Sequence, residues 1–97
     1  MSNDLSQKNA EYFSKITLDA AIVGETYEIV TCEVQNDATT RLAEMGLVPK
    51  TRVTVLKTAP LGDPMEILAR GYSVCIRASE AKAFVVRPIG RNTSQKE

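Results

Sequence analysis

The stretch that decides the fold runs from residue 51 to residue 77 and reads TRVTVLKTAPLGDPMEILARGYSVCIR. Residues 51–57 alternate, with Val53 and Val55 on one face, which is typical of a half-buried strand. Two further extended runs, residues 65–70 and 72–77, lie on either side of Gly71. Their close spacing predicts a β-hairpin whose two strands share one apolar face. The residues on that face are Met65, Ile67, Ala69, Val74 and Ile76, whereas Cys75 points outward.

Residues 59–64, between these strands, read APLGDP. Two prolines and a glycine in six positions exclude both a helix and a central strand, so this segment is predicted to be a rigid surface turn. Asp63 within it is expected to accept hydrogen bonds from nearby backbone N–H groups, as aspartate often does in turns.

Toward the N-terminus, residues 26–34 also alternate and predict a strand with Val30, Cys32 and Val34 facing the core. A short helix then follows, with N-caps offered by Asn36 and Asp37. The helix runs through Met45, with Ala38, Leu42 and Met45 on one side. Gly46 is expected to end it in the left-handed conformation that disfavours a Cβ atom.

Toward the C-terminus, Ser79 is expected to cap a single helical turn, and Phe84 and Val86 mark a last strand. The chain is therefore predicted to be mainly β, with about five strands and one or two short helices in a small, partly open SH3-like barrel. We place this domain at residues 16–89. Residues 1–15 are expected to be a mobile polar leader, and residues 90–97 a disordered tail.

The composition argues against several classes of function. The 12 basic and 12 acidic residues give no net charge, so the basic excess of a nucleic-acid-binding protein is missing. No apolar run is long enough to insert into a bilayer, and residues 1–15 lack the apolar core of a signal peptide, which predicts a cytoplasmic protein.

The sequence also offers little catalytic chemistry. It has no histidine, no phosphate-binding glycine motif, and only two cysteines, which lie outside any CxxC pattern. The carboxylates, Glu28, Glu33, Glu44 and Glu66 among them, are scattered over different predicted elements. We therefore predict no catalytic residue, no metal ligand and no cofactor, and a domain that works by binding a partner.

The motifs RLAEMGLVP at residues 41–49 and APLGDP at residues 59–64, with Val53 and Val55 between them, resemble the FeoA family of bacterial ferrous iron transport accessory proteins. The similarity starts at about Ile16 and covers nearly all of the chain between the two ends. One departure is Lys50, where the family often has glycine. Lysine at this position predicts a turn that does not require a positive φ angle.

The resemblance implies a cytoplasmic accessory protein that docks on the cytosolic or membrane-proximal face of a FeoB-type ferrous iron transporter and supports or regulates iron uptake. The alternative it leaves open is an SH3-like regulatory module, related to the C-terminal domain of metal-dependent repressors, that acts in trans. The sequence also leaves open whether copies of the domain associate weakly, and whether an open sheet edge accepts an added strand.

Two surfaces are the candidates for partner contact. On the predicted helix, Arg41 and Glu44 point away from Leu42, which is expected to lie in the core. On the proline turn, Pro60 and Leu61 lie at the tip, where Leu61 has no core to reach. An apolar side chain on an ordered loop loses little entropy on docking, which favours a protein contact.

Overall fold

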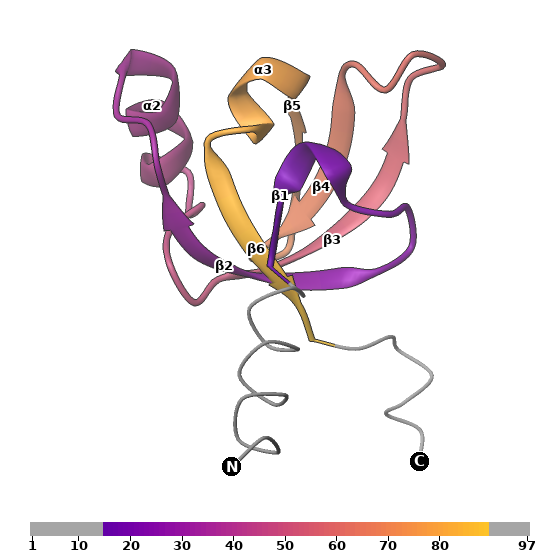
Figure 1. Cartoon of the computed structure of the whole chain (residues 1–97), viewed down its shortest axis with the longest axis horizontal. Helices are drawn as coiled ribbons and strands as arrows, with labels where there is room; N and C mark the ends of the chain where they lie inside the picture. The colour runs from indigo at the N-terminus through magenta and orange to yellow at the C-terminus, as the bar shows by residue number, and fades with distance from the viewer. Residues whose placement is uncertain (1–14, 90–97) are drawn as a thin grey trace, which may run out of the picture.

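A computed structural model describes residues 15–89, and these residues form one antiparallel sheet that curls into a partly open barrel (Figure 1). This confirms the predicted mainly β, SH3-like class. The expectations for residues 1–14 and 90–97 lie outside the described residues. The strands are β1 (Ile16–Thr17), β2 (Thr26–Cys32), β3 (Arg52–Thr58), β4 (Met65–Ala69), β5 (Tyr72–Ile76) and β6 (Phe84–Pro88). The helices are the 3-10 helix η1 (Leu18–Ala20) and the α-helices α2 (Asp37–Glu44) and α3 (Ala78–Ala81).

The strands lie in the order β1-β6-β2-β3-β4-β5, and every neighbouring pair is antiparallel. In the described part of the chain β1 and β5 stand at the two ends of this order, so the barrel is partly open. The sequence did not predict β1 as a strand, because its two residues are too few to show a period. Its place is set by pairing with β6, where Ile16 lies opposite Val86.

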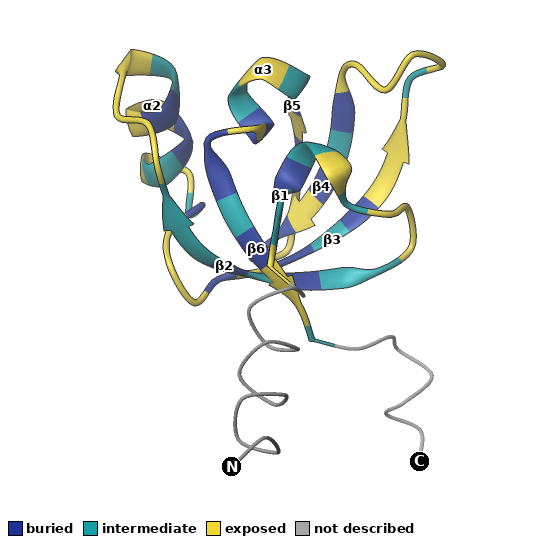
Figure 2. Cartoon of the chain, in the orientation of Figure 1, coloured by how far each residue is buried: buried dark blue, intermediate teal, exposed yellow. Residues whose placement is uncertain are grey.

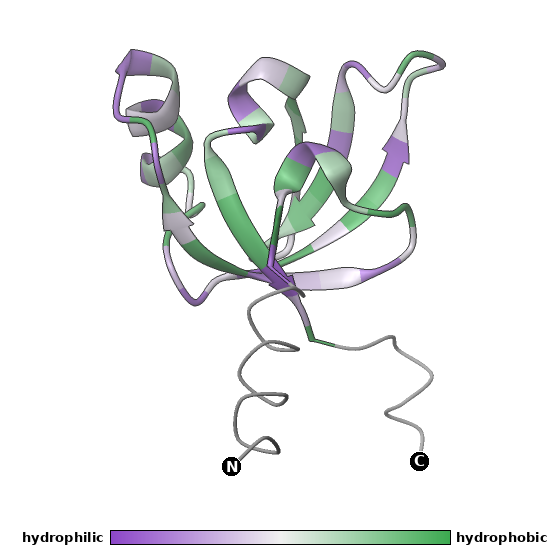
Figure 3. Ribbon diagram, viewed as in Figure 1, coloured by the Kyte–Doolittle hydropathy of each residue, from purple (hydrophilic) through white to green (hydrophobic). Residues whose placement is uncertain are grey.

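The core lies inside the curl of the sheet, where the buried segments meet in Figure 2 and apolar residues gather in Figure 3. Phe84 at the start of β6 is its largest fully buried side chain. The predicted inward faces of β3, β4, β5 and β6 are confirmed, because all of their expected residues are buried. These are Val53, Val55, Met65, Ile67, Ala69, Val74, Ile76, Phe84 and Val86.

The predicted hairpin is the tightest part of the fold. β4 and β5 pair without a register shift and are joined by only Arg70 and Gly71. Both turn residues have positive φ angles, of 56° and 86°. Two consecutive left-handed residues match the right-handed twist of the flanking strands, as in a type I′ turn.

The predicted face of β2 was largely wrong. Tyr27 and Ile29 are the buried residues of this strand, while Val34 lies beyond its end and is 47% exposed. The reason is a register shift: Ile29 pairs with Val86 and Thr31 with the next residue, Val85, so Val30 is an extra residue in a bulge. Before the bulge the odd-numbered residues Tyr27 and Ile29 face the core, and after it the even-numbered Cys32 does. Of the three residues predicted to face inward, only Cys32 therefore packs against the core.

Helix α2 confirms the predicted cap at Asn36 and the predicted stop at Gly46, although it ends at Glu44, one residue before the predicted Met45. The side chain of Asn36 accepts a hydrogen bond from the Thr39 N–H at 2.9 Å, and the hydroxyl of Thr39 accepts one from the Asn36 N–H. At the other end Gly46 has a φ of 112°, and Leu47 donates back to the Leu42 carbonyl at 3.0 Å. These bonds form a Schellman motif, in which the buried Leu42 and Leu47 meet.

The predicted apolar side of this helix needs one correction. Leu42 is buried and Ala38 is half-buried, but Met45 is 49% exposed. Met45 follows the last helical residue, with a φ of −85° and a ψ of 1°. It has left the helical path, so the helical spacing no longer turns it inward.

The prediction that Ser79 caps α3 was wrong. The helix begins at Ala78, and Arg77 is the residue before it. Glu80 holds this start in place, because its carboxylate accepts a hydrogen bond from the Arg77 N–H at 3.0 Å. Ser79 is an exposed residue inside the helical turn.

The prediction for Lys50 was also wrong, since this residue has a φ of 78°. The turn is held from both sides by one residue of β2. Lys50 donates to the Ile29 carbonyl at 2.7 Å, and the Ile29 N–H donates to the Thr51 carbonyl at 2.9 Å. These hydrogen bonds require the left-handed conformation whatever side chain is present.

We therefore expect Lys50→Gly to stabilise the domain by about 0.5–1 kcal/mol. The left-handed conformation costs a residue with a side chain about 1–2 kcal/mol, and glycine avoids this cost. The greater freedom of glycine in the unfolded chain offsets about 0.4–1 kcal/mol of the resulting gain in stability. Urea unfolding measures the difference. Lys50→Ala is the matched control, because it removes the charge and keeps the Cβ atom; equal stabilisation by both variants would contradict the strain at this turn.

Candidate partner-binding surfaces

The outer side of α2 carries the first pair of predicted contact residues. Arg41 and Glu44 are exposed, while Thr39 and Leu42 on the other side are buried. Among the described residues no hydrogen bond or ion pair is recorded for either charged side chain. Both are therefore available to a partner without breaking a contact of the fold.

The turn between β3 and β4 carries the second pair. Pro60 is exposed and Leu61 is 96% exposed, the largest exposed fraction of any large apolar residue in the described part of the chain. This confirms that Leu61 lies at a tip with no core to reach. The base of the turn is closed by hydrogen bonds from Ala59 to the Pro64 carbonyl at 2.9 Å and from Gly62 to the Ala59 carbonyl at 2.7 Å.

Asp63 ties this turn to the rest of the barrel. Its Oδ1 atom accepts a hydrogen bond from the Ala78 N–H at 2.9 Å. The sequence predicted that the carboxylate accepts from the backbone, but it placed the donor nearby in the turn. The donor instead opens α3, fifteen positions along the chain. The contact both caps α3 and orders the turn that presents Leu61.

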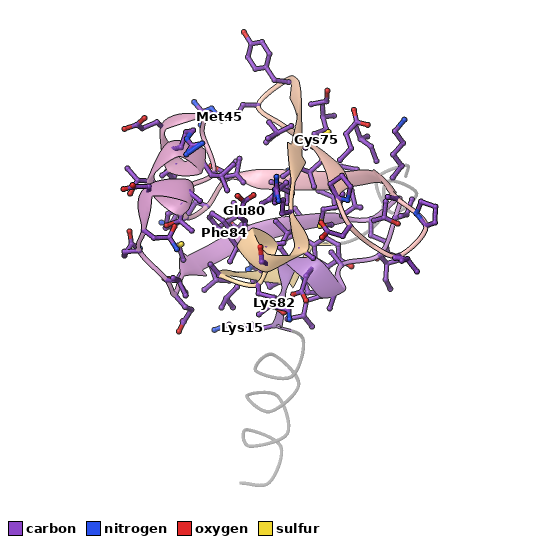
Figure 4. All side chains as sticks on the ribbon, turned by 90° about the horizontal axis from the view of Figure 1, so that it is seen from above. Lys15, Met45, Cys75, Glu80, Lys82 and Phe84 are labelled. Carbon is purple, nitrogen blue, oxygen red and sulfur yellow. The ribbon has the colours of Figure 1, made fainter. Side chains whose placement is uncertain are left out.

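The two predicted surfaces do not form one patch. In Figure 1 and again in Figure 4, seen from above, α2 and the turn between β3 and β4 lie at opposite sides of the molecule, with the barrel between them. A single small partner element cannot cover both. They are therefore separate candidates, to be tested separately.

Several exposed apolar residues were missed from the sequence. Met45 extends from the end of α2, away from the central Phe84 (Figure 4). Tyr72 is 74% exposed although it lies on the inward face of β5, because it pairs with Ala69 beside the turn, at the end of the hairpin. The sequence did carry a signal for the exposure of Tyr72, because it directly follows Gly71 of the predicted turn, and a residue next to a tight turn lies at the edge of the core.

The chemistry of the described residues gives no sign of an active centre. Glu28 and Glu66, two of the scattered carboxylates, form ion pairs with Arg87 and Lys57. Cys32 and Cys75 are both free thiols, on β2 and β5. No three potential metal ligands come together anywhere in residues 15–89. Over the same residues, no helix has the length and apolar character to cross a bilayer.

The architecture defines the class of protein as an SH3-like domain. A zinc-bound FeoA from Stenotrophomonas maltophilia, described as a prokaryotic SH3 domain protein, superposes with a TM-score of 0.65 at 28% identity, over 73% of this chain and 88% of that one. An FeoA-like protein from Clostridium acetobutylicum superposes with a TM-score of 0.73 at 26% identity, over 81% of this chain and 92% of that one.

The FeoA domain model matches residues 16–88, and the chain belongs to the FeoA family. The iron(II) transport protein A from Clostridium thermocellum is similar with a TM-score of 0.74 at 28% identity, over 77% of this chain; the match covers 46% of that longer chain. A comparison with curated protein sequences finds no match.

The fold is shared more widely than the family. IdeR of T. acidophilum superposes with a TM-score of 0.69 at 21% identity, over 77% of this chain and 34% of that one. A manganese-dependent transcriptional repressor superposes with a TM-score of 0.68 at 18% identity. At these identities the likeness shows the fold alone.

The Asp63 contact yields a prediction about the turn. We expect Asp63→Ala to destabilise the domain by about 0.5–1.5 kcal/mol, because the Ala78 N–H loses its acceptor. Asp63→Asn keeps an oxygen at the same position and should lose about half as much, since a neutral acceptor is weaker than a carboxylate. Thermal unfolding compares the three proteins, and equal losses in the two variants would show that the acceptor atom is not what matters.

Proposed function

We propose that this chain is a cytoplasmic accessory protein that docks on a FeoB-type ferrous iron transporter and supports or regulates iron uptake. The observation that carries the proposal is the match of the FeoA domain over residues 16–88. Similar proteins are described as an iron(II) transport protein and an iron uptake regulatory protein. A third is described as a candidate activating factor of bacterial ferrous iron transport.

Docking on a partner, without catalysis, is the mode of action that the surface supports. The most exposed large apolar side chain, Leu61, is presented by a turn whose backbone hydrogen bonds and Asp63 contact are already formed. A pre-ordered apolar contact pays little entropy when it is buried against a partner. Arg41 and Glu44 on α2 offer the second, charged contact surface, and Pro60 flanks Leu61 in the first.

The docking surfaces are tested by capture of a FeoB-type transporter from detergent-solubilised membranes. We expect Leu61→Asp to weaken capture by about tenfold or more, because a carboxylate would be buried in an apolar contact. Arg41→Glu should weaken it by about two- to fivefold, as is typical of an exposed charge pair.

Matched controls separate these effects from a general change of surface. Ile22→Asp introduces the same carboxylate at another loop residue, which is 60% exposed. Lys82→Glu reverses an exposed charge beside α3. Both controls should be captured like the native protein. Native-like capture of Leu61→Asp and Arg41→Glu would remove both proposed surfaces, and failure of the native protein to be captured would remove the proposed function.

The alternative function, a regulatory module of repressor type that acts in trans, is supported only by the shared fold. It predicts that the domain changes the binding of a repressor to DNA in the presence of ferrous or manganese ions. A gel shift with and without the domain tests it, and an unchanged shift removes it.

A further inference from the structure

The open edge of β5 differs from the other end of the sheet. β5 is five residues long, carries no charge and no proline, and pairs with β4 without a bulge. Proteins usually protect an edge strand with a charged residue, a proline or a bulge, or keep the strand very short. β1, at the other end, is protected in that way, because it has only two residues and leads directly into η1.

The backbone groups on this edge can be assigned from the hairpin. In a hairpin with a two-residue turn, the pair next to the turn exchanges hydrogen bonds, and the following pairs alternate. Ala69 and Tyr72 form that first pair. Ser73 and Cys75 therefore direct their N–H and C=O groups away from β4, and within residues 15–89 no strand pairs with that side.

The surroundings of the edge suggest the chemistry of its partner. Arg70 and Arg77 are exposed at the two ends of β5, which spans about 17 Å at about 3.4 Å per residue. No acidic residue lies within residues 70–77. Tyr72, 74% exposed, adds an aromatic ring, a side chain that would pack favourably against a strand added at this edge.

We propose that β5 is a strand-addition site, which binds an extended protein segment that is apolar or neutral in its middle and acidic at both ends. Main-chain hydrogen bonds to Ser73 and Cys75 supply the affinity, and Arg70 and Arg77 select the acidic ends.

The charges argue against a second copy of this chain as the occupant. In the two-fold antiparallel pairing that places Ser73 of one copy opposite Cys75 of the other, Arg77 lies opposite Gly71 and beside Arg70 of the second copy. The same approach of two arginines recurs at the other end of the paired strands. Like charges in neighbouring positions of paired strands are destabilising, whereas an acidic segment gains at both ends.

The test uses the full chain and two labelled peptides. One is Asp-Thr-Val-Thr-Val-Thr-Val-Asp, and the other has lysine in place of both aspartates. We expect fluorescence polarisation to show the acidic peptide binding about threefold tighter or more, from two exposed ion pairs, with the difference shrinking at high salt. Amide hydrogen exchange should slow at Ser73 and Cys75 when this peptide is added. Equal binding of the peptides, or no protection of these amides, would overturn the proposal.

The backbone contact is tested with Ser73→Pro, which removes one outward N–H that β4 does not use. Binding should be lost, while Ser73→Ala, which keeps the N–H, should bind like the native protein. If Ser73→Pro does not fold, Arg77→Glu replaces it, with Arg77→Gln as its control. The glutamate variant should lose the peptide preference, because Arg70 still attracts one acidic end while the other end meets a like charge. Native-like binding by Ser73→Pro or an unchanged preference in Arg77→Glu would contradict the site.

Protection of Ser73 and Cys75 that rises with protein concentration and needs no peptide would show that a second copy occupies the edge, and would overturn the proposed occupant. The inference goes beyond the proposed transporter contact, which uses α2 and the turn between β3 and β4. Because the peptide experiment contains no transporter, the two proposals fail independently.

Discussion

The fold depends on the backbone of Ile29, which is held between two neighbours in the middle of the sheet. On one side Ile29 pairs with Val86 of β6, and on the other its N–H and C=O groups bond to Thr51 and Lys50. The next residue, Val30, is the extra residue of the bulge. Because bulges bend a strand and increase its twist, this is the point at which β2 turns from the side of the barrel toward α2.

The same constraint decides the backbone around it. The turn after α2 must return its N–H and C=O groups to Ile29, so Lys50 adopts a left-handed conformation despite its side chain. Before the bulge, Tyr27 is buried, and its hydroxyl oxygen accepts the Ile22 N–H at 3.0 Å. An otherwise costly buried phenol thereby anchors the loop that leads into β2.

The proposed binding surfaces follow from how the barrel is closed. The helix α2 and the turn between β3 and β4 leave the sheet at opposite sides, so the fold offers two separate contact regions and an open strand edge. Asp63 links the turn to α3 and thus connects the position of Leu61 to the framework. The rigid turn, the charged helix face and the unprotected edge are the three regions at which we propose partner contacts.

The sequence predictions that were confirmed depend on interactions between residues close together in the chain. The alternation in β3, β4 and β5, the turn at Gly71 and the capping of α2 by Asn36 each depend on residues a few positions apart, which the sequence displays directly. The exposure of Arg41, Glu44, Pro60 and Leu61 followed from the same patterns. Whether they bind a partner depends on that partner's surface, which neither the sequence nor the fold contains.

By itself, then, the sequence determined five of the six strands and the two short α-helices, because apolar period and turn chemistry act over short distances. Only the tertiary structure decided which face of β2 is buried, the conformation of Lys50 and the donor that Asp63 accepts from. Each of these depends on a hydrogen bond between residues more than ten positions apart, and a bulge of a single residue reverses a face without leaving a mark in the apolar pattern.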